Sequence, residues 1–179
     1  MKATRQYAHR VRAALRDLGI DTAVPERRAL ALHMEAPRLA CAGIGTDGRD
    51  KFLAVPAARA WRTLAARAAR DGVQLQLISG FRSLEFQVAL IRGKLQRGLS
   101  LDEILRVNAP PGYSEHHTGC ALDIGTPGCA PLEEAFEQTP AFAWLQGNAW
   151  ALGFSLSYPR DNAEGYLYEP WHWRWRPRR

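Results

Sequence analysis

The stretch from position 114 to position 123, SEHHTGCALD, gathers residue types that bind metals: two adjacent histidines and Asp123. Near the C-terminus, Glu169 and His172 add another carboxylate and another imidazole. A catalytic zinc site uses three protein ligands, keeps one position open for water and has a general base beside it. The two segments supply that set of groups, so the sequence predicts a zinc centre if the fold brings them together.

His116 and Asp123 lie seven positions apart, with Gly119 between them. That separation does not place both residues on one helical face, where neighbours are three or four apart. It suits a loop that turns at the glycine and enters a strand, so that the two side chains lie next to each other. His117 is an alternative ligand, a residue that supports the ligands, or a side chain that points away; the sequence favours the last.

Glu169 precedes His172 by three positions, and Pro170 lies between them. In a regular strand, residues three apart point to opposite faces of the sheet. Proline cannot continue an ordinary strand ladder. We therefore predict a bend at Pro170 that brings Glu169 and His172 to one side and leaves Glu169 as a spare carboxylate beside the ligands.

Arg82 lies in the segment 79–83, SGFRS, where a predicted strand gives way to a helix. A single arginine usually lies on the protein surface without a special role. At a junction rich in glycine and serine, however, a planar guanidinium can donate several hydrogen bonds to an oxyanion or a carboxylate. Arg82 is therefore a candidate catalytic residue.

Hydrophobic periodicity divides the chain into helices and short strands. The glycines and proline of segment 36–50 are typical of a loop. Tryptophans alternate with His172 and Arg174 near the C-terminus, and we expect them to pack into the core rather than stack on a glycan. Helices are predicted at 3–18, 25–33, 55–70, 83–96, 100–107 and 139–150, and strands at 73–77, 120–124, 153–158 and 169–175. This order predicts an α+β fold with a small, mainly antiparallel sheet and flanking helices.

The composition of the 179-residue chain fits one domain, with or without an N-terminal extension. Its three cysteines lack the spacing of a disulfide framework or a structural zinc site, so we expect free thiols. The net charge of +6 comes without a nucleic-acid recognition motif, so no nucleic-acid partner is expected. We recognise no membrane span and no signal peptide, so the chain as given is expected in the cytoplasm, or outside it if trimmed or released by lysis.

Three motifs together resemble the zinc peptidases of the D-alanyl-D-alanine carboxypeptidase and dipeptidase family. Segment 114–123 is similar to the family's SxHxxGxAxD signature, and EPWH at 169–172 to its ExxH element. SGFRS, followed by Gln87, is similar to the SGYRS...Q segment of the VanY-like carboxypeptidase branch. The resemblance implies a zinc fold of the hedgehog and D-Ala-D-Ala-peptidase type, with a zinc peptidase domain at 51–179 and a helical extension at 1–50.

The resemblance also implies a role for each candidate residue. The implied ligands of Zn²⁺ are His116, Asp123 and His172. The implied catalytic and substrate-binding residues are the general base Glu169, the carbonyl-polarising Arg82, and the substrate contacts Ser114 and Gln87. On this basis we expect a zinc-dependent D,D-carboxypeptidase that hydrolyses the terminal D-Ala-D-Ala bond of peptidoglycan stem peptides or muropeptides.

Several departures from the family pattern bear on which peptide is cut. His117 stands where relatives usually carry Gln or Asn, and Cys120 where they often carry Leu. Ser157 replaces an arginine before Tyr-Pro, and Glu164 replaces a threonine before glycine. None of these positions is an implied ligand or base.

Other functions remain open from the sequence. An L,D-carboxypeptidase and a phage-type peptidoglycan endopeptidase would use the same chemistry on other bonds. A zinc-bearing binding module without turnover belongs to a different class; the presence of Glu169 and Arg82 argues against it, because a structural zinc site needs neither. The sequence also leaves open the oligomeric state.

Overall fold

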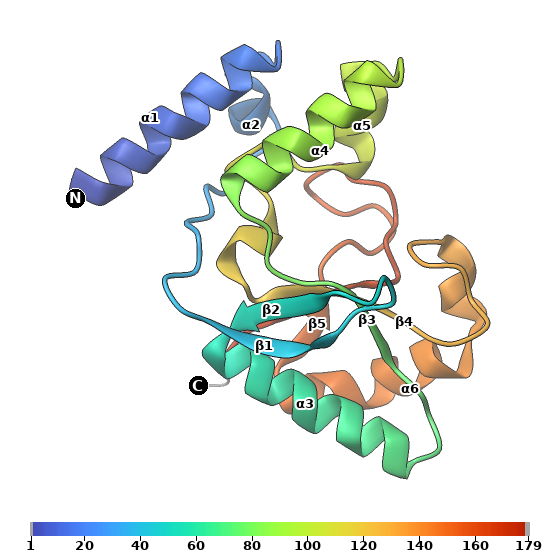
Figure 1. The fold of residues 1–179 in the computed structure, drawn as a ribbon. Coiled ribbons are helices and arrows are strands. Elements are labelled where there is room, and N and C mark those ends of the chain that lie inside the picture. The colour runs from blue at the N-terminus through green and yellow to red at the C-terminus, as the bar shows by residue number, and fades with distance from the viewer. Residues whose placement is uncertain (1, 178–179) are drawn as a thin grey trace.

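The computed structural model describes residues 2–177, and Figure 1 shows its elements in chain order. The first part of the chain contains α1 (Lys2–Asp17), α2 (Val24–Arg27), β1 (Leu39–Ile44), β2 (Asp50–Ala54) and α3 (Val55–Arg70). The middle contains β3 (Gln76–Ser79), α4 (Leu84–Gln96), α5 (Leu101–Val107), the 3-10 helix η1 (Glu115–Thr118) and β4 (Ala121–Gly125). The last part contains η2 (Glu134–Gln138), α6 (Pro140–Asn148), η3 (Ala149–Leu152), β5 (Phe154–Leu156) and β6 (His172–Trp175). None of these helices is long and apolar enough to cross a bilayer.

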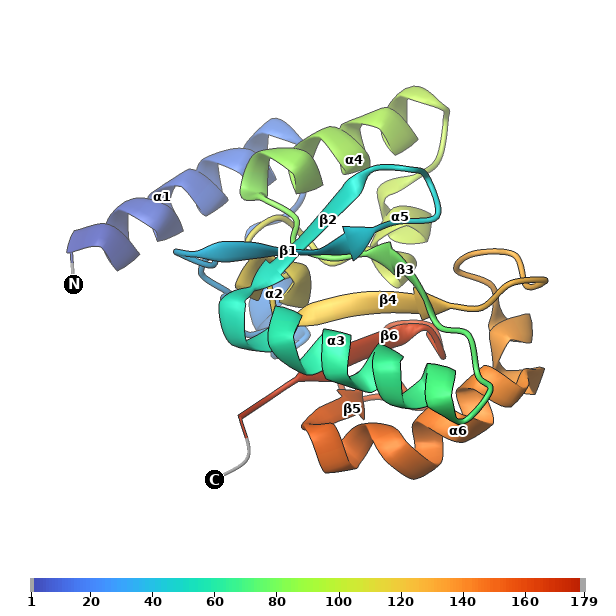
Figure 2. The ribbon, with the colours of Figure 1, turned by 60° about the horizontal axis from the view of Figure 1, so that its bottom comes forward.

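The main sheet has four antiparallel strands in the order β3–β4–β6–β5, so β4 and β6 are central. β1 and β2 form a separate antiparallel hairpin. Helices α3 and α6 cover one face of the main sheet, whereas α1, α4 and α5 lie on its other side (Figure 1, Figure 2). This is the expected α+β architecture with an antiparallel sheet and flanking helices.

The two faces of the central strands separate the hydrophobic core from the polar site. Leu122 and Ile124 of β4 and Trp173 of β6 are buried in the cluster that includes α3 and α6. Asp123 and His172 alternate with these residues, so their side chains leave the sheet on the opposite face. Burial of each large apolar side chain contributes about 1.5–3 kcal/mol, and this fixes which face carries the polar residues.

Helix α1 packs on α4 and α5 through its own apolar face. Val11 and Leu15 of α1 are buried together with Ile91 of α4 and Ile104 of α5. The expected boundary between residues 50 and 51 falls within β2, and the partner strand β1 precedes it. The first fifty residues therefore contribute a strand and a buried helix face to the rest of the fold.

The observed secondary structure differs from the sequence prediction at several elements, and three of the differences have a clear local cause. Segment 36–50 contains β1 instead of only loop, because its glycines occupy a bulge in that strand and the turn after it. β3 begins at Gln76 rather than residue 73, because the Val73 amide donates to the Ala68 carbonyl and closes the end of α3. The helix expected at 25–33 ends at Arg27, since Ala29 adopts a positive φ of 50°.

Three predicted helix starts are confirmed by their N-terminal hydrogen bonds. Ser83 and Thr139 each accept a hydrogen bond from the amide three residues later. Ser100 and Glu103 form the reciprocal bonds of a capping box. Such caps typically contribute about 1 kcal/mol each. The cap at Ser83 also fixes the chain directly after Arg82, at the junction where the site is built.

Candidate active site

The three predicted metal ligands come from neighbouring elements. Asp123 of β4 and His172 of β6 lie directly opposite each other in the antiparallel ladder, so their side chains share one face. His116 lies in η1, just before β4. Gly119 ends η1 with a left-handed φ of 63° and turns the chain into the strand. The glycine turn expected from the sequence therefore brings His116 to Asp123.

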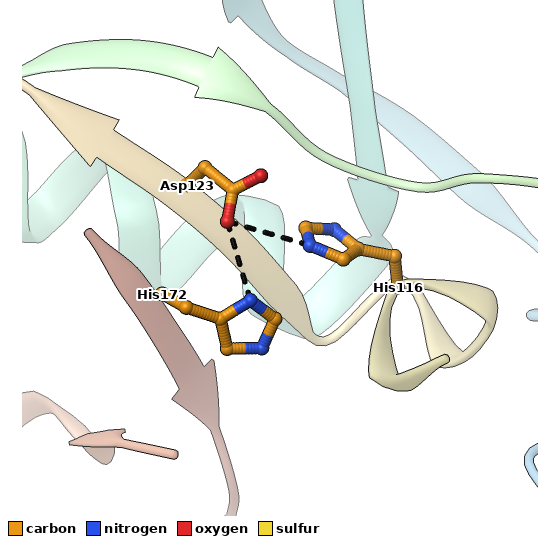
Figure 3. Close-up of side chains that lie close together, drawn as sticks. All are labelled: His116, Asp123 and His172. Atoms are coloured by element: carbon orange, nitrogen blue, oxygen red, sulfur yellow. Dashed lines mark ion pairs between the residues drawn. The ribbon is translucent and has the colours of Figure 1, made fainter. Parts of the chain in front are cut away.

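Three donor atoms of these residues face one another (Figure 3). Asp123 Oδ1 lies 3.4 Å from Nε2 of His116 and 3.2 Å from Nδ1 of His172. The ligand atoms all lie within 4.8 Å of one another, and the three residues are buried. His116 Nε2 and Asp123 Oδ1 have no hydrogen-bond partner within residues 2–177, although unpaired buried polar atoms are costly. Two imidazole nitrogens and a carboxylate oxygen are a donor set that fits Zn²⁺ with one position left open.

Hydrogen bonds on the far side of each ring determine which nitrogen faces the metal position. Nδ1 of His116 lies 2.7 Å from the Gly80 carbonyl oxygen, so it carries the proton and leaves Nε2 free. In His172 the two nitrogens have exchanged roles. Its Nε2 lies 3.1 Å from Glu115 Oε2 and carries the proton, while its Nδ1 faces the other donor atoms. Gly80 is required for this approach, since a Cβ there would lie 2.5 Å from the Phe52 carbonyl oxygen.

Burial and neighbouring charges give the two ligand imidazoles different pKa values. Burial and the charge of Arg82 lower the pKa of His116 to about 4, which keeps its Nε2 lone pair free. Burial disfavours charge on His172 as well, but the nearby carboxylates of Asp123 and Glu115 outweigh it and raise the pKa of His172 to about 10. Burial alone would raise the pKa of Asp123, yet the two imidazoles and Arg82 hold it well below its usual range. The carboxylates therefore favour a cation among the three donors.

Glu169 lies beside the ligands with the properties of a general base. The bend predicted at Pro170 is present, and within it the His172 amide donates to the Glu169 carbonyl oxygen at 3.1 Å. Glu169 Oε2 consequently lies 3.6 Å from Nδ1 of His172. Burial in the cavity raises the pKa of Glu169 to about 7, a value at which a carboxylate can accept a proton and release it again.

Arg82 is anchored next to the ligands by two of its nitrogens. Nη2 donates to Asp123 Oδ2 at 2.9 Å, and Nε donates to Ser79 Oγ at 3.3 Å. Asp123 therefore uses one carboxylate oxygen toward the two imidazoles and the other toward the guanidinium. Nη1 has no hydrogen-bond partner among the described side chains, and Arg82 lines the cavity, so this nitrogen can donate to a bound group.

The ligands, Glu169 and Arg82 line a cavity of about 520 Å³. Its other walls come from α4, the segment after α5 and the segment before β6, with apolar surface from Phe86, Leu90 and Trp171. Ser114 also lines the cavity, two positions before His116, and is 4% exposed. The volume and the mixture of apolar walls with a few polar groups suit a short peptide.

Gln87 does not line the cavity, in contrast to the substrate contact that the resemblance implied. Its side chain is completely buried, and Nε2 donates to the Ala109 carbonyl oxygen at 2.8 Å. The reason is helical geometry, because Gln87 is rotated by about 100° from the cavity-lining Phe86. Ala109 does line the cavity, so Gln87 supports a wall instead of touching its contents.

His117 faces away from the metal donors, but into the protein. Its Nε2 accepts a hydrogen bond of 3.0 Å from the Gly112 amide, which leaves the proton on Nδ1. Nδ1 then donates to the Arg82 carbonyl oxygen at 2.7 Å. The ring therefore ties together the two loops that carry His116 and Arg82. His117 thus stabilises the loops that position His116 and Arg82.

Glu115 is a buried carboxylate behind His172 that none of the sequence motifs identified as a site residue. Its Oε2 faces His172 and accepts a hydrogen bond of 2.6 Å from Ser157 Oγ, and its Oε1 pairs with Arg174. Burial opposes the charge on Glu115, but the partners named here outweigh it and lower its pKa well below the usual range. A carboxylate directly next to the ligand His116 was the available signal in the sequence.

Comparison with known proteins identifies D-Ala-D-Ala carboxypeptidases and dipeptidases as relatives of this chain. The chain is 32% identical to a D-alanyl-D-alanine carboxypeptidase of Enterococcus faecium over 74% of its own length and 40% of the relative. It is 29% identical to a bifunctional D-Ala-D-Ala dipeptidase and carboxypeptidase, VanXYC of Enterococcus gallinarum, over 85% of this chain and 80% of the relative. The chain thus spans less than half the length of the first of these two proteins.

Solved structures agree with the fold. The LD-carboxypeptidase LdcB superimposes with a TM-score of 0.70 and 31% identity, covering 81% of this chain and 71% of LdcB. A zinc(II) complex of a mutant of the vancomycin-resistance D,D-pentapeptidase VanY gives a TM-score of 0.61 and 25% identity, covering 82% of each chain. The profile of the VanY family, described as D-alanyl-D-alanine carboxypeptidase, matches residues 50–178. The chain therefore belongs to the VanY D-alanyl-D-alanine carboxypeptidase family.

Proposed function

We propose that this protein is a zinc-dependent D,D-carboxypeptidase that removes the terminal D-alanine from peptidoglycan stem peptides ending in D-Ala-D-Ala. One observation supports the proposal most strongly. The metal-donor residues His116, Asp123 and His172 line the same cavity as Glu169 and Arg82. Membership of the VanY family supports the substrate class. The zinc(II) complex of the VanY relative supports the choice of metal.

In the proposed mechanism, the metal and the side chains around it have separate chemical roles. Zinc supplies a Lewis acid and lowers the pKa of water when bound. Glu169 accepts a proton from the attacking water as the new C–O bond forms at the scissile carbonyl carbon. Arg82 donates a hydrogen bond to the oxygen on which negative charge develops. Glu169 then gives its proton to the leaving amine as the C–N bond breaks.

Ser114 is proposed to orient the peptide, because this residue lines the cavity together with the proposed ligands. Asp123 orients Arg82 through the ion pair at 2.9 Å while its other oxygen serves the metal position. These contacts hold the catalytic groups in place before substrate binds, which is the condition for electrostatic stabilisation of a transition state.

A second candidate is L,D-carboxypeptidase activity on tetrapeptides. The observation that favours it is the likeness to LdcB, a structure described as an LD-carboxypeptidase. The two activities would use the same catalytic groups and differ in the stereochemistry of the residue before the scissile bond. The peptide contacts in the cavity, and not the metal site, would decide between them.

The test is mass spectrometry of defined stem pentapeptides and tetrapeptides after incubation with zinc-loaded protein. D,D-carboxypeptidase activity predicts loss of one D-alanine from the pentapeptide, and L,D-carboxypeptidase activity predicts its loss from the tetrapeptide. The matched control is Glu169→Gln, which keeps the size of the side chain and removes the base. If neither peptide loses D-alanine while the control and wild type both bind zinc, the proposed function is wrong.

A further inference from the structure

Lys94 places a positive charge in the wall of the catalytic cavity. It follows Phe86 and Leu90 on α4 at intervals of four residues, and all three line the cavity. Residues at this spacing share one face of a helix. The cavity-facing side of α4 therefore begins with apolar residues and ends with a lysine about 12 Å along the helix axis from Phe86.

The amine of Lys94 has no anionic partner in the described part of the chain. Its hydrogen bond goes to the neutral amide of Asn108, through Oδ1. No ion pair within residues 2–177 includes Lys94. Arg82, by contrast, is paired with Asp123. Of these two cavity cations, Lys94 is thus the one that lacks a carboxylate.

The surroundings of Lys94 favour the binding of an anion next to its amine. The residue is half-buried, and burial lowers its pKa, as do the positive charges of Arg97 and Arg82. The charge of Glu169 acts in the opposite direction without forming an ion pair. A partly desolvated cation near other cations gains stability from an anion that binds beside it.

Asn108 adds a second donor next to this amine. Because Lys94 donates to Oδ1, the amide must present its Nδ2 on the other side. Nδ2 has no acceptor among the described residues, and Asn108 also lines the cavity. An ammonium and an amide N–H side by side can bind the two oxygens of one carboxylate.

We propose that Lys94 and Asn108 form a subsite that binds a free carboxylate of the peptide and so determines which peptides are accepted. This inference rests on the proposed peptidase function. A stem pentapeptide offers two such groups near the scissile bond. One is its terminal carboxylate, and the other is the side-chain carboxylate of a diaminopimelate in the third position. A lysine in that position lacks this carboxylate and carries only the ammonium that diaminopimelate also has.

The experiment measures binding by calorimetry in zinc-loaded Glu169→Ala protein, which prevents turnover, with and without Lys94→Met. The three probes are a pentapeptide with diaminopimelate in the third position, the same peptide with lysine there, and the first peptide with a terminal amide. Lys94→Met is expected to weaken binding of the first probe about tenfold or more, which is about 1.4 kcal/mol or more. The probe whose affinity no longer depends on Lys94 identifies the carboxylate.

Two control variants separate a local contact from general charge effects. Arg97→Met removes one positive charge from the end of α4 without touching the cavity wall, and it is expected to leave the affinities within about twofold, because exposed charges are screened. Lys94→Arg keeps the charge and should restore most of the affinity. Thermal unfolding confirms that each variant is folded.

Two results would overturn the subsite. One is equal affinity of Lys94→Met and its parent for all three probes, and the other is an absence of measurable binding of any probe by the parent protein. The proposed peptidase function is judged separately, by release of D-alanine from the first probe by protein with an intact Glu169. A failure of the subsite alone leaves that release unchanged.

Discussion

Glu115 Oε2 lies 3.1 Å from Nε2 of His172, on the side of the ring opposite the atom that faces Asp123. This arrangement orients the imidazole of a proposed metal ligand and favours the tautomer whose Nδ1 is free. Second-sphere carboxylates of this kind typically change metal affinity by about 10–100-fold. Arg174 and Ser157 hold Glu115 in place from its other sides.

We therefore expect Glu115→Gln to weaken zinc binding by about 10–100-fold while the protein remains folded. The measurement is a competition titration with a chromophoric zinc chelator. Ser157→Ala is the matched control, because it removes one neutral hydrogen bond to the same carboxylate and leaves the charge. Its effect should be smaller. Unchanged zinc affinity in Glu115→Gln would show that the carboxylate does not act on the metal site.

The adjacent histidines provide a second test, since their rings have different partners. His116→Ala removes a donor atom and is expected to abolish stoichiometric zinc binding, measured by metal analysis after dialysis. His117→Phe keeps the ring shape and should retain zinc. It should, however, lower the free energy of unfolding by about 1–3 kcal/mol for each polar group left unpaired, here the Gly112 amide and the Arg82 carbonyl. The opposite pattern would mean that His117 is the ligand.

Arg82 should affect the catalytic rate more than metal binding. Arg82→Met removes the proposed donor to the developing oxyanion, for which a loss of about 10²–10³-fold in kcat is expected. Zinc stoichiometry should remain near one, because the three donor atoms come from other residues. Peptide hydrolysis and metal analysis on the same preparation give both values. A loss of zinc equal to the loss of activity would assign Arg82 a structural role through Asp123.

The N-terminal helix should be indispensable for folding. Deletion of residues 1–50 removes β1 and exposes Leu84, Ile91 and Ile104, which are buried against α1. Even the single change Leu15→Ala is expected to cost about 2–5 kcal/mol of unfolding free energy. Urea unfolding followed by circular dichroism measures the cost, and Arg16→Ala on the exposed face of α1 is the control. A stable, cooperatively unfolding truncated protein would establish residues 1–50 as an independent extension.

The titration of His33 should account for part of the pH dependence of the free energy of unfolding. Burial, with help from the charge of Arg174, lowers the pKa of His33 to about 4, whereas an unfolded histidine titrates near about 6.5. Between these values the unfolded state binds more protons, so this residue makes stability rise with pH from about 4 to 6.5 and has no effect above that range. His33→Gln should show a shallower loss of stability below pH 6.5. Identical slopes in urea titrations at pH 4.5, 5.5 and 7 would contradict the assignment.

Much of the site was predictable from the sequence because its residues lie in short local motifs. Gly119 determines a turn by its left-handed conformation, and Pro170 determines a bend because it cannot extend a ladder. Each feature places a candidate residue, His116 or Glu169, relative to its neighbours along the chain. The helix starts at 83, 100 and 139 were predictable for the same reason, since a cap uses only residues three apart.

What the tertiary structure decided depends on contacts between distant segments. The register of β4 with β6 sets Asp123 opposite His172, and no local pattern specifies which residues of two strands are paired. Glu115 gains its function from His172 and Arg174, which lie far away in the chain. Gln87 lies outside the cavity lining because packing turns that face of α4 inward, where its side chain is buried and bonds the Ala109 carbonyl oxygen. Local sequence motifs thus identified the candidate catalytic residues, and the long-range packing of the sheet and helices decided how these residues come together.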